Sequence, residues 1–265
     1  APHVLARLLH DAALKALRAL PSEGQLEAQV DLANKLLGVL GETSTQSGVS
    51  RDDWLTNPAQ LLLAITRASE KRLGTGELAR PSLPLRHSDL LVNGPRDLRV
   101  GNEVRRELAS ADRVDLLLSF VKWSGIRLLK DELREFVARR PGGLRVLTTT
   151  YMGATEATAI EFLINELKAD VRISYDTRRT RLHAKAWLFH RDSGFSTGLV
   201  GSSTLSSAAM LDGIEWNVRL SNIDNGPILA KFVTTFDQYW ADGEYEAYDR
   251  ARFLEATEHR DSDRD

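Results

Sequence analysis

Residues 181–190 read RLHAKAWLFH, an apolar segment that is interrupted by an imidazole and an ammonium group. The segment predicts a β-strand, in which successive side chains point to opposite faces. His183 and Lys185 would then share one face with Trp187 and Phe189. A strand end is the ordinary explanation for such a pair, with a neighbour satisfying the histidine and the lysine extending into solvent. The spacing alone therefore leaves a structural and a functional interpretation open.

The chain around this strand alternates between helix and strand patterns. We expect helices at residues 101–110, 125–140 and 155–169 and strands at 113–121, 144–151 and 170–175. Such alternation is typical of a mostly parallel sheet with helices on its faces. Departures from this rhythm are the strands predicted at 181–190, 194–202 and 213–221 and a closing helix at 227–240. We therefore predict an α/β fold for residues 85–265, with a mixed sheet flanked by helices.

Residues 1–84 are predicted to form a helical N-terminal region. Apolar residues recur every three and four positions in 3–40, which indicates two amphipathic helices with a break at 21–24. A polar loop at 41–50 precedes a third predicted helix, which begins with Asn-Pro and covers 57–73. Two prolines make 81–87 a plausible linker, because proline disfavours both helix and central strand.

Composition excludes several kinds of chemistry. The 265 residues are 42% hydrophobic, which is enough for a substantial core. We find no membrane-spanning run and no signal peptide, so we expect a soluble, cytoplasmic protein without a membrane partner. The absence of cysteine excludes disulfides, thiolate zinc sites and a cysteine nucleophile. With a net charge of -2, the chain would have to hold a nucleic acid through a local basic patch.

A second polar group follows the strand at 194–202. Residues 201–204 read GSST and precede a helix-like segment, where unpaired N–H groups can bind an anion. An ordinary Ser/Thr helix cap has the same sequence. Glu215 opens the next apolar strand, and a buried glutamate requires a cationic or imidazole partner, which His183 would supply.

The ordered set of His183, Lys185, GSST at 201–204 and Glu215 resembles the phospholipase D superfamily, and within it the bacterial nuclease branch. Residues 85–240 look like the nuclease module at the N-terminus of certain bacterial superfamily 2 helicases. The resemblance implies a phospholipase D-like fold and a nucleic-acid substrate, DNA before RNA. No helicase motif is present in this chain, so a separate helicase partner is a further expectation.

The resemblance also implies a mechanism without a metal or any other cofactor. One histidine attacks phosphorus to form a phosphohistidine, and a second histidine protonates the leaving oxygen. By position, His183 is the nucleophile or the acid, and Lys185 and Ser202 bind phosphate oxygens. Glu215 would orient a histidine ring and fix its tautomer.

One chain supplies half of such a site. The mechanism needs two histidines and two lysines, yet no other histidine is followed two positions later by lysine. The resemblance to members with a single motif implies a homodimer, in which two copies of 181–190 meet across a two-fold axis.

Two positions depart from the family pattern. His190 stands where the family has a generally structural aspartate, so we interpret His190 as a core or edge residue. Thr204 stands where the family commonly has an asparagine that donates to phosphate. Ser203 or Asn217 would have to replace that donor, or the enzyme is weakened.

Other residues are candidates for substrate contact. Arg179 and Arg181, with the neighbouring Arg178, could follow a nucleic-acid backbone or lie in a solvated loop. Lys122 and Trp123 come after a buried strand, where α/β proteins place ligand-binding loops. Lys122 could contact phosphate, and Trp123 could stack on a base or pack into the core.

Three functions are compatible with these residues. The first is a metal-independent endonuclease that works in DNA repair, restriction or phage defence. The second is a catalytically weakened module for DNA binding and dimerisation. The third, a phospholipid phosphodiesterase, is disfavoured because the sequence shows no amphipathic membrane anchor.

Overall fold

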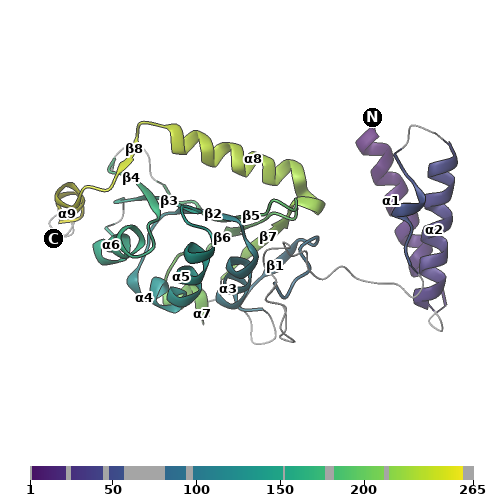
Figure 1. The fold of residues 1–265 in the computed structure, drawn as a ribbon, viewed down its shortest axis with the longest axis horizontal. Coiled ribbons are helices and arrows are strands. Elements are labelled where there is room, and N and C mark those ends of the chain that lie inside the picture. Colours follow the sequence, from purple (N-terminus) through teal and green to yellow (C-terminus); the bar gives the residue numbers. More distant parts are fainter. Residues whose placement is uncertain are drawn as a thin grey trace. The chain divides into compact units, whose positions relative to one another are not determined.

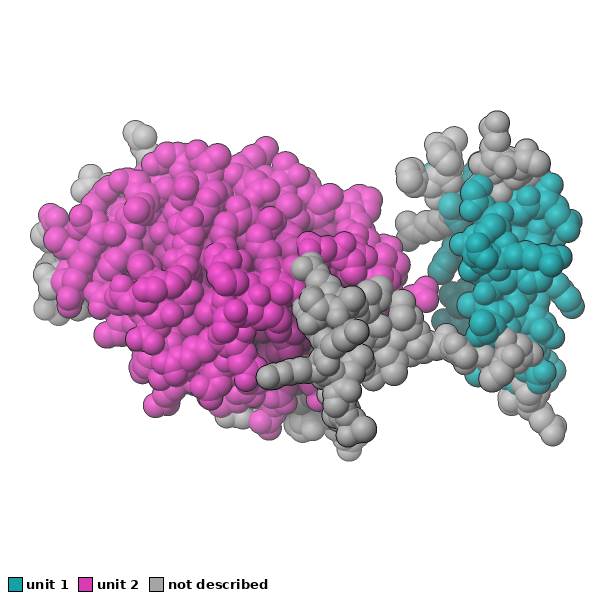
Figure 2. Space-filling model, viewed as in Figure 1, with its two compact units in different colours: residues 1–65 teal, residues 66–265 magenta. Residues whose placement is uncertain are grey.

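A computed structural model describes residues 2–21, 25–43, 48–56, 81–93, 98–151, 153–176, 182–211 and 215–258. The chain divides into two compact units, residues 1–65 and residues 66–265, which Figure 2 shows in different colours. The sequence-based division after residue 84 stays a prediction.

The first unit contains a pair of helices. They are α1 (Pro2–Arg18) and α2 (Gln25–Thr43), followed by a short 3-10 helix, η1 (Arg51–Asp53). Both predicted N-terminal helices are confirmed, and the break between them falls where proline and glycine interrupt the pattern. Asn34 of α2 fixes the segment after η1, because its side chain exchanges hydrogen bonds of 2.8 and 2.9 Å with the backbone of Leu55. The helix predicted at 57–73 lies outside the described residues.

The described part of the second unit contains an eight-stranded sheet in the order β1-β7-β6-β5-β2-β3-β4-β8. The strands are β1 (Asp89–Leu91), β2 (Arg113–Leu118), β3 (Leu144–Thr149), β4 (Asp170–Ser174), β5 (Lys185–His190), β6 (Thr197–Gly201), β7 (Asn217–Ser221) and β8 (Tyr245–Ala247). β2, β3 and β4 are parallel, and every other neighbouring pair is antiparallel. The mixed sheet that the sequence predicted is therefore confirmed, and its parallel part coincides with the regular alternation of strand and helix.

Helices cover both faces of this sheet (Figure 1). They are α3 (Val100–Ser110), α4 (Trp123–Leu128), α5 (Lys130–Arg139), α6 (Ala157–Asn165), α7 (Ser207–Leu211), α8 (Asn222–Ala241) and α9 (Arg250–Glu258). The first five lie on one face, over a core that includes Trp187 and Phe189. The long helix α8 crosses the other face, where Leu229 and Phe236 pack with Leu188. No helix of the described residues combines the length and apolar content needed to cross a bilayer.

The structure differs from the predicted elements in several places. The helix expected at 125–140 is two helices, α4 and α5, which meet at Leu129 with φ -113° and ψ 10°. β5 begins at Lys185, so His183 lies before the strand, and β7 begins at Asn217, so Glu215 also lies outside its strand. β1 and β8, three residues each, were not predicted because so short a segment carries no readable period.

The segment predicted as a linker is fastened to the second unit. Its Ser82 and Leu83 N–H groups donate to the buried carboxylate of Glu103, at 3.1 and 3.3 Å. The fully buried Arg219 of β7 donates to the carbonyl oxygens of Pro84 and His87. Segment 81–87 therefore belongs to the wall of this unit, next to β1 and β7.

Candidate active site

The candidate site lies at one edge of the sheet, where several chain segments end or begin. β2 ends there and continues to Lys122, and β6 ends there and continues through 202–205. β5 begins there, and the segment 215–216 leads into β7. Backbone contacts hold these segments together: the Ser119 N–H donates to the Ala184 carbonyl oxygen (3.1 Å), and the Lys122 N–H donates to that of Leu205 (3.0 Å). Residues far apart in the sequence are thus brought to a common edge.

His183 and Lys185 both occupy this edge. Lys185 is the first residue of β5, where it pairs with Leu118 of β2, and it is half-buried. His183 is exposed, and among the described residues its imidazole has no hydrogen-bond partner. The Lys185 ammonium donates to the His183 carbonyl oxygen at 3.3 Å. Neither side chain is paired with a described carboxylate, so both remain available to an anionic ligand.

Ser202 and Glu215 form a second pair at the edge. The Ser202 hydroxyl donates to the Glu215 carboxylate and accepts the Trp216 N–H at 3.0 Å. The Ser202 N–H in turn donates to the Trp216 carbonyl oxygen at 3.0 Å. Gly201 makes this approach of the two segments feasible, because a Cβ there would lie 2.0 Å from the same carbonyl oxygen. In this chain Glu215 is half-exposed and contacts Ser202, not His183 as we expected.

The remaining residues of the GSST turn face inward. Ser203 and Asn217 are both 3% exposed, and they bind each other through two hydrogen bonds of 3.2 and 2.7 Å. Thr204 is 5% exposed, and its hydroxyl lies 3.2 Å from that of Ser206. The helix that follows, α7, has five residues and begins only at Ser207. The turn therefore does not form the anion-binding helix start that the sequence suggested, and Ser202 is its exposed hydroxyl.

Lys122 and Trp123 border the same edge. Lys122 is half-buried and directly precedes α4, and the Trp123 N–H donates to Glu156 at 2.7 Å. The Trp123 ring packs edge-to-face on Phe162, with ring centroids 5.3 Å apart, and lies against the core. Of the two roles considered for Trp123, stacking on a base or packing into the core, this position fits packing. Arg179 and Arg181 lie outside the described residues.

A different polar cluster occupies the opposite end of β5. The His190 imidazole Nε2 lies 2.6 Å from a carboxylate oxygen of Asp115, a side chain with no exposed surface. Arg145 binds both oxygens of the same carboxylate, at 2.7 and 2.8 Å, and also reaches Asp237 of α8. Burial alone would raise the pKa of Asp115, but hydrogen bonds from Arg145 and His190 outweigh it and hold that pKa below its ordinary value. His190 is therefore a structural residue, as its place in the sequence suggested.

Trp216 also borders the site, although the sequence did not mark it as a site residue. Its side chain is 62% exposed, directly after Glu215, whereas Asn217 and Arg219 on the opposite face of β7 are buried. We expected this segment to be an apolar strand, and two of its hydrophobic residues, Trp216 and Val218, are instead exposed, whereas Leu220 is buried. The alternation in EWNVRL was a usable signal, but only the structure shows which face is covered.

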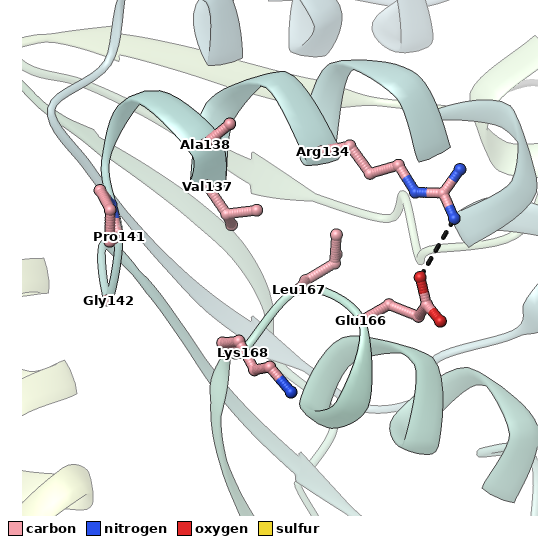
Figure 3. Close-up of a pocket in the computed structure, with 8 residues that line it drawn as sticks. All are labelled: Arg134, Val137, Ala138, Pro141, Gly142, Glu166, Leu167 and Lys168. Carbon is pink, nitrogen blue, oxygen red and sulfur yellow. Dashed lines mark hydrogen bonds and ion pairs between the residues drawn. The ribbon is translucent and has the colours of Figure 1, made fainter.

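A pocket lined by α5 and by the segments before β3 and β4 lies away from this edge (Figure 3). It is bounded by residues before β3 and before β4, at the opposite end of those strands, and Arg134 pairs with Glu166 beside it at 3.2 Å. The described residues bring together no group of three or more His, Asp or Glu side chains that could hold a metal ion. Neither feature adds a group to the candidate site.

Comparisons with known proteins identify similar solved structures. NucT from Helicobacter pylori is 14% identical over 61% of this chain and 99% of NucT, with a TM-score of 0.45. Nuc from Salmonella typhimurium, a phospholipase D family member, is 16% identical over 61% of this chain and 97% of Nuc, with a TM-score of 0.43. TrmBL2, an archaeal chromatin protein with a novel mode of DNA binding, is 15% identical over 93% of this chain and 71% of TrmBL2, with a TM-score of 0.39.

A scan against protein-family models and a search of curated proteins find no match. At these identities and TM-scores, a function has to be supported by the residues of this chain itself.

Proposed function

We propose that this chain is a metal-independent nucleic-acid phosphodiesterase, an endonuclease that acts on DNA through a phosphohistidine intermediate. The observation that supports it is that His183 and Lys185 lie at the same edge of the sheet as the pair of Ser202 and Glu215. These groups have the chemistry that phosphodiester cleavage needs: a nucleophile, a fixed cation and hydrogen-bond donors for phosphate oxygens.

The reaction needs two imidazoles in opposite protonation states. A neutral His183 attacks phosphorus, the bond from phosphorus to the leaving oxygen breaks, and a protonated second histidine gives its proton to that oxygen. The second histidine, now neutral, takes a proton from water, which attacks phosphorus and releases the first histidine. Lys185 stabilises the charge on the non-bridging oxygens in both steps, and Ser202 does so when its hydroxyl turns from Glu215 to the phosphate.

We propose that a second copy of the chain supplies the second histidine and lysine. β5 lies between β6 and β2, so both of its sides are already hydrogen-bonded and it cannot pair with the β5 strand of a partner. Only its start, at His183 and Lys185, is free to meet the equivalent start across a two-fold axis. The two copies would then approach with these sheet edges facing each other.

The biological setting proposed is DNA repair, restriction or phage defence, alone or beside a helicase.

Cleavage of single-stranded DNA, duplex DNA and RNA in the presence of EDTA tests the chemistry. We expect the wild type to cleave DNA and His183→Ala to be inactive, because the variant removes nucleophile and acid from both halves of the site. Equal cleavage by the two proteins would refute the site, and cleavage that EDTA abolishes would refute the metal-free mechanism.

A catalytically weakened module for DNA binding and dimerisation is the second candidate. It is favoured by the burial of Thr204, Ser203 and Asn217, which leaves Ser202 as the only exposed hydroxyl of the described GSST turn. Binding of DNA by wild type and His183→Ala alike, with no cleavage by either, would support this candidate over the nuclease.

A further inference from the structure

The segment after β2, residues 119–122, connects the two parts of the candidate site. At its first residue, the Ser119 N–H donates to the carbonyl oxygen of Ala184, which lies between the histidine and the lysine of the half-site. At its last residue, the Lys122 N–H donates to the carbonyl oxygen of Leu205, which directly follows the GSST turn. The segment therefore runs from the start of β5 to the turn that carries the exposed hydroxyl.

Two side chains of this segment, Phe120 and Lys122, point away from the core. Val121 lies between them and is fully buried in the core, and the backbone at Lys122 is extended, with φ -111° and ψ 146°. Phe120 and Lys122 are each half-buried, and the Lys122 ammonium lies 5.9 Å from the centroid of the Phe120 ring. The two side chains therefore lie on one side of the segment, as extended backbone places every second residue.

This side of the segment is also the side of the half-site. Lys185 pairs with Leu118 of β2, and directly opposite side chains of an antiparallel ladder share a face. The hydrogen bond of Ser119 extends this ladder by one residue pair, which brings Phe120 to the position opposite His183. The ammonium group that rests on the phenyl ring therefore lies on the same face as the imidazole and the first ammonium group.

Lys122 combines a fixed backbone with a charge that is free to bind an anion. Its carbonyl oxygen accepts the N–H groups of Gly125 and Ile126, at 3.1 and 3.2 Å. Gly125 lets α4 lie directly against Leu205, because a Cβ there would be 2.3 Å from the Leu205 carbonyl carbon. The Lys122 side chain does not cap α4, and it forms no ion pair with a carboxylate in the part of the chain that the structure describes.

We propose that Lys122 binds the phosphate next to the one that is cleaved, and that this contact makes the site select polynucleotides over isolated phosphodiesters. The inference rests on the proposed function, which assigns the cleaved phosphate to Lys185 of both copies. A phosphodiester has two non-bridging oxygens, and two lysine ammonium groups are enough to bind them. A further cation on the same face therefore serves the neighbouring phosphate of the strand.

Phe120 is a positioning residue in this arrangement. It touches no phosphate, but the face of its ring attracts the Lys122 ammonium and keeps it on the side of the half-site. An ammonium group that is held in place before the substrate arrives loses less side-chain freedom on binding.

Three small substrates separate the cleaved phosphate from its neighbour. TpT has a single internucleoside phosphate, and pTpT and TpTp add a phosphate on one side or the other without changing the bond that breaks. With EDTA present, the wild-type kcat/KM should be about fivefold higher for one of the phosphorylated substrates than for TpT, as for one ion pair in contact with water. Lys122→Gln should reduce this ratio to about one, and Lys122→Arg should retain it.

Lys168→Gln is the matched control. Lys168 is exposed and lies two residues before β4, at the opposite end of the strands, so this variant should keep the wild-type ratio. Phe120→Leu keeps an apolar side chain without a π-face and should lower the ratio by about twofold, whereas Phe120→Tyr should retain it. Circular dichroism verifies that each variant folds.

The salt dependence of binding is a readout that does not require cleavage. Fluorescence anisotropy of a labelled oligothymidylate gives the dissociation constant at several salt concentrations. Loss of one phosphate contact lowers the slope of log affinity against log salt by about 0.7 for a single strand. Lys122→Gln should show at least this decrease, and Lys168→Gln should have the wild-type slope.

The outcomes separate this inference from the proposed function. If wild type and Lys122→Gln share one substrate ratio and one salt slope, Lys122 binds no neighbouring phosphate, even when both proteins cleave DNA. An equal loss of kcat/KM on all three substrates in Lys122→Gln would assign the lysine to the cleaved phosphate and overturn the inference. If no protein cleaves any substrate but Lys122→Gln lowers the salt slope, the phosphate contact stands and the proposed function fails.

Discussion

The two ends of β5 carry polar groups in opposite circumstances. At the start, His183 is exposed with no described side-chain partner, and Lys185 contacts only a backbone oxygen. At the end, His190 is mostly buried and bound to Asp115, which Arg145 also binds with two hydrogen bonds. One strand of six residues thus separates two groups that pair with no described carboxylate from a closed ion-pair cluster.

This difference indicates where chemistry can occur. The carboxylate of Asp115 already has its hydrogen bonds, so His190 contributes to the packing of β2, β3 and α8. An imidazole and an ammonium group that pair with no described carboxylate, at an exposed edge, can instead bind a phosphate. The cost of leaving them unpaired is small, because water solvates them until a ligand arrives.

The largest effect is expected from substitutions at the two ends of β5. Lys185→Met keeps the apolar stem and removes the charge, so DNA cleavage should fall by about 10²–10³-fold, as for the loss of one donor to a transition-state oxygen. The free energy of unfolding should change by less than about 1 kcal/mol, because the ammonium group makes no described ion pair. Steady-state cleavage and urea unfolding measure the two effects.

His190→Asn is the matched control. It should leave cleavage within about threefold of the wild type and lower the free energy of unfolding by about 1–2 kcal/mol, because the Asp115 carboxylate loses a hydrogen bond. A large loss of cleavage with normal stability in His190→Asn would contradict the division of β5 into a catalytic start and a structural end.

Asp115→Asn should have the next largest effect, on stability. The substitution removes the buried one of the two charged partners of Arg145 and leaves only Asp237, and breaking a buried pair in this way costs about 3 kcal/mol. Because folding lowers the pKa of Asp115, its stabilising contribution is complete above its ordinary pKa, near about 4, and is lost as the pH falls through the folded value.

Unfolding at several pH values measures this contribution. The free energy of unfolding of the wild type should fall more steeply with acid than that of Asp115→Asn. Burial would raise the pKa of Glu107, but the pairing with Arg191 and Arg219 outweighs it and lowers that pKa overall. Glu107 is present in both proteins and therefore contributes equally to the two pH curves. If the free energy of unfolding depends on pH in the same way for both proteins, the ionisation of Asp115 does not account for the loss of stability in acid.

Local periodicity explains which parts of the fold could be predicted. The strands of the parallel region and the pair of N-terminal helices have a clear period, so their sequences were sufficient. The break at Leu129 could not be read, because the pattern of 125–140 is helical on both sides of it. Nor could the pairing of His190 with Asp115 or the inverted burial of β7 be read from the sequence, since both depend on segments distant along the chain.

The candidate site was predictable to a similar extent. The spacing of His183 and Lys185 and the order of the downstream motif indicated which residues to compare, and the structure describes them at one edge of the sheet. The contacts of Glu215 with Ser202 and of Ser203 with Asn217 required the close approach of two segments that Gly201 permits. The close approach of two distant segments leaves no periodic pattern in the sequence from which it could be predicted.

The smallest effect is expected at the GSST turn, where Ser202 can be compared with Ser206, two residues after the turn. Ser202→Ala removes the hydroxyl that binds Glu215 and accepts the Trp216 N–H, so cleavage should fall by about 10–100-fold, as for other groups that position a reacting residue. Ser206→Ala removes a hydroxyl that contacts the buried Thr204 hydroxyl, and should leave cleavage within about threefold. Initial rates on one DNA substrate, with and without EDTA, measure both variants. If the two substitutions reduce cleavage equally, the hydroxyl of Ser202 has no special role, and the active part of this edge is limited to the start of β5.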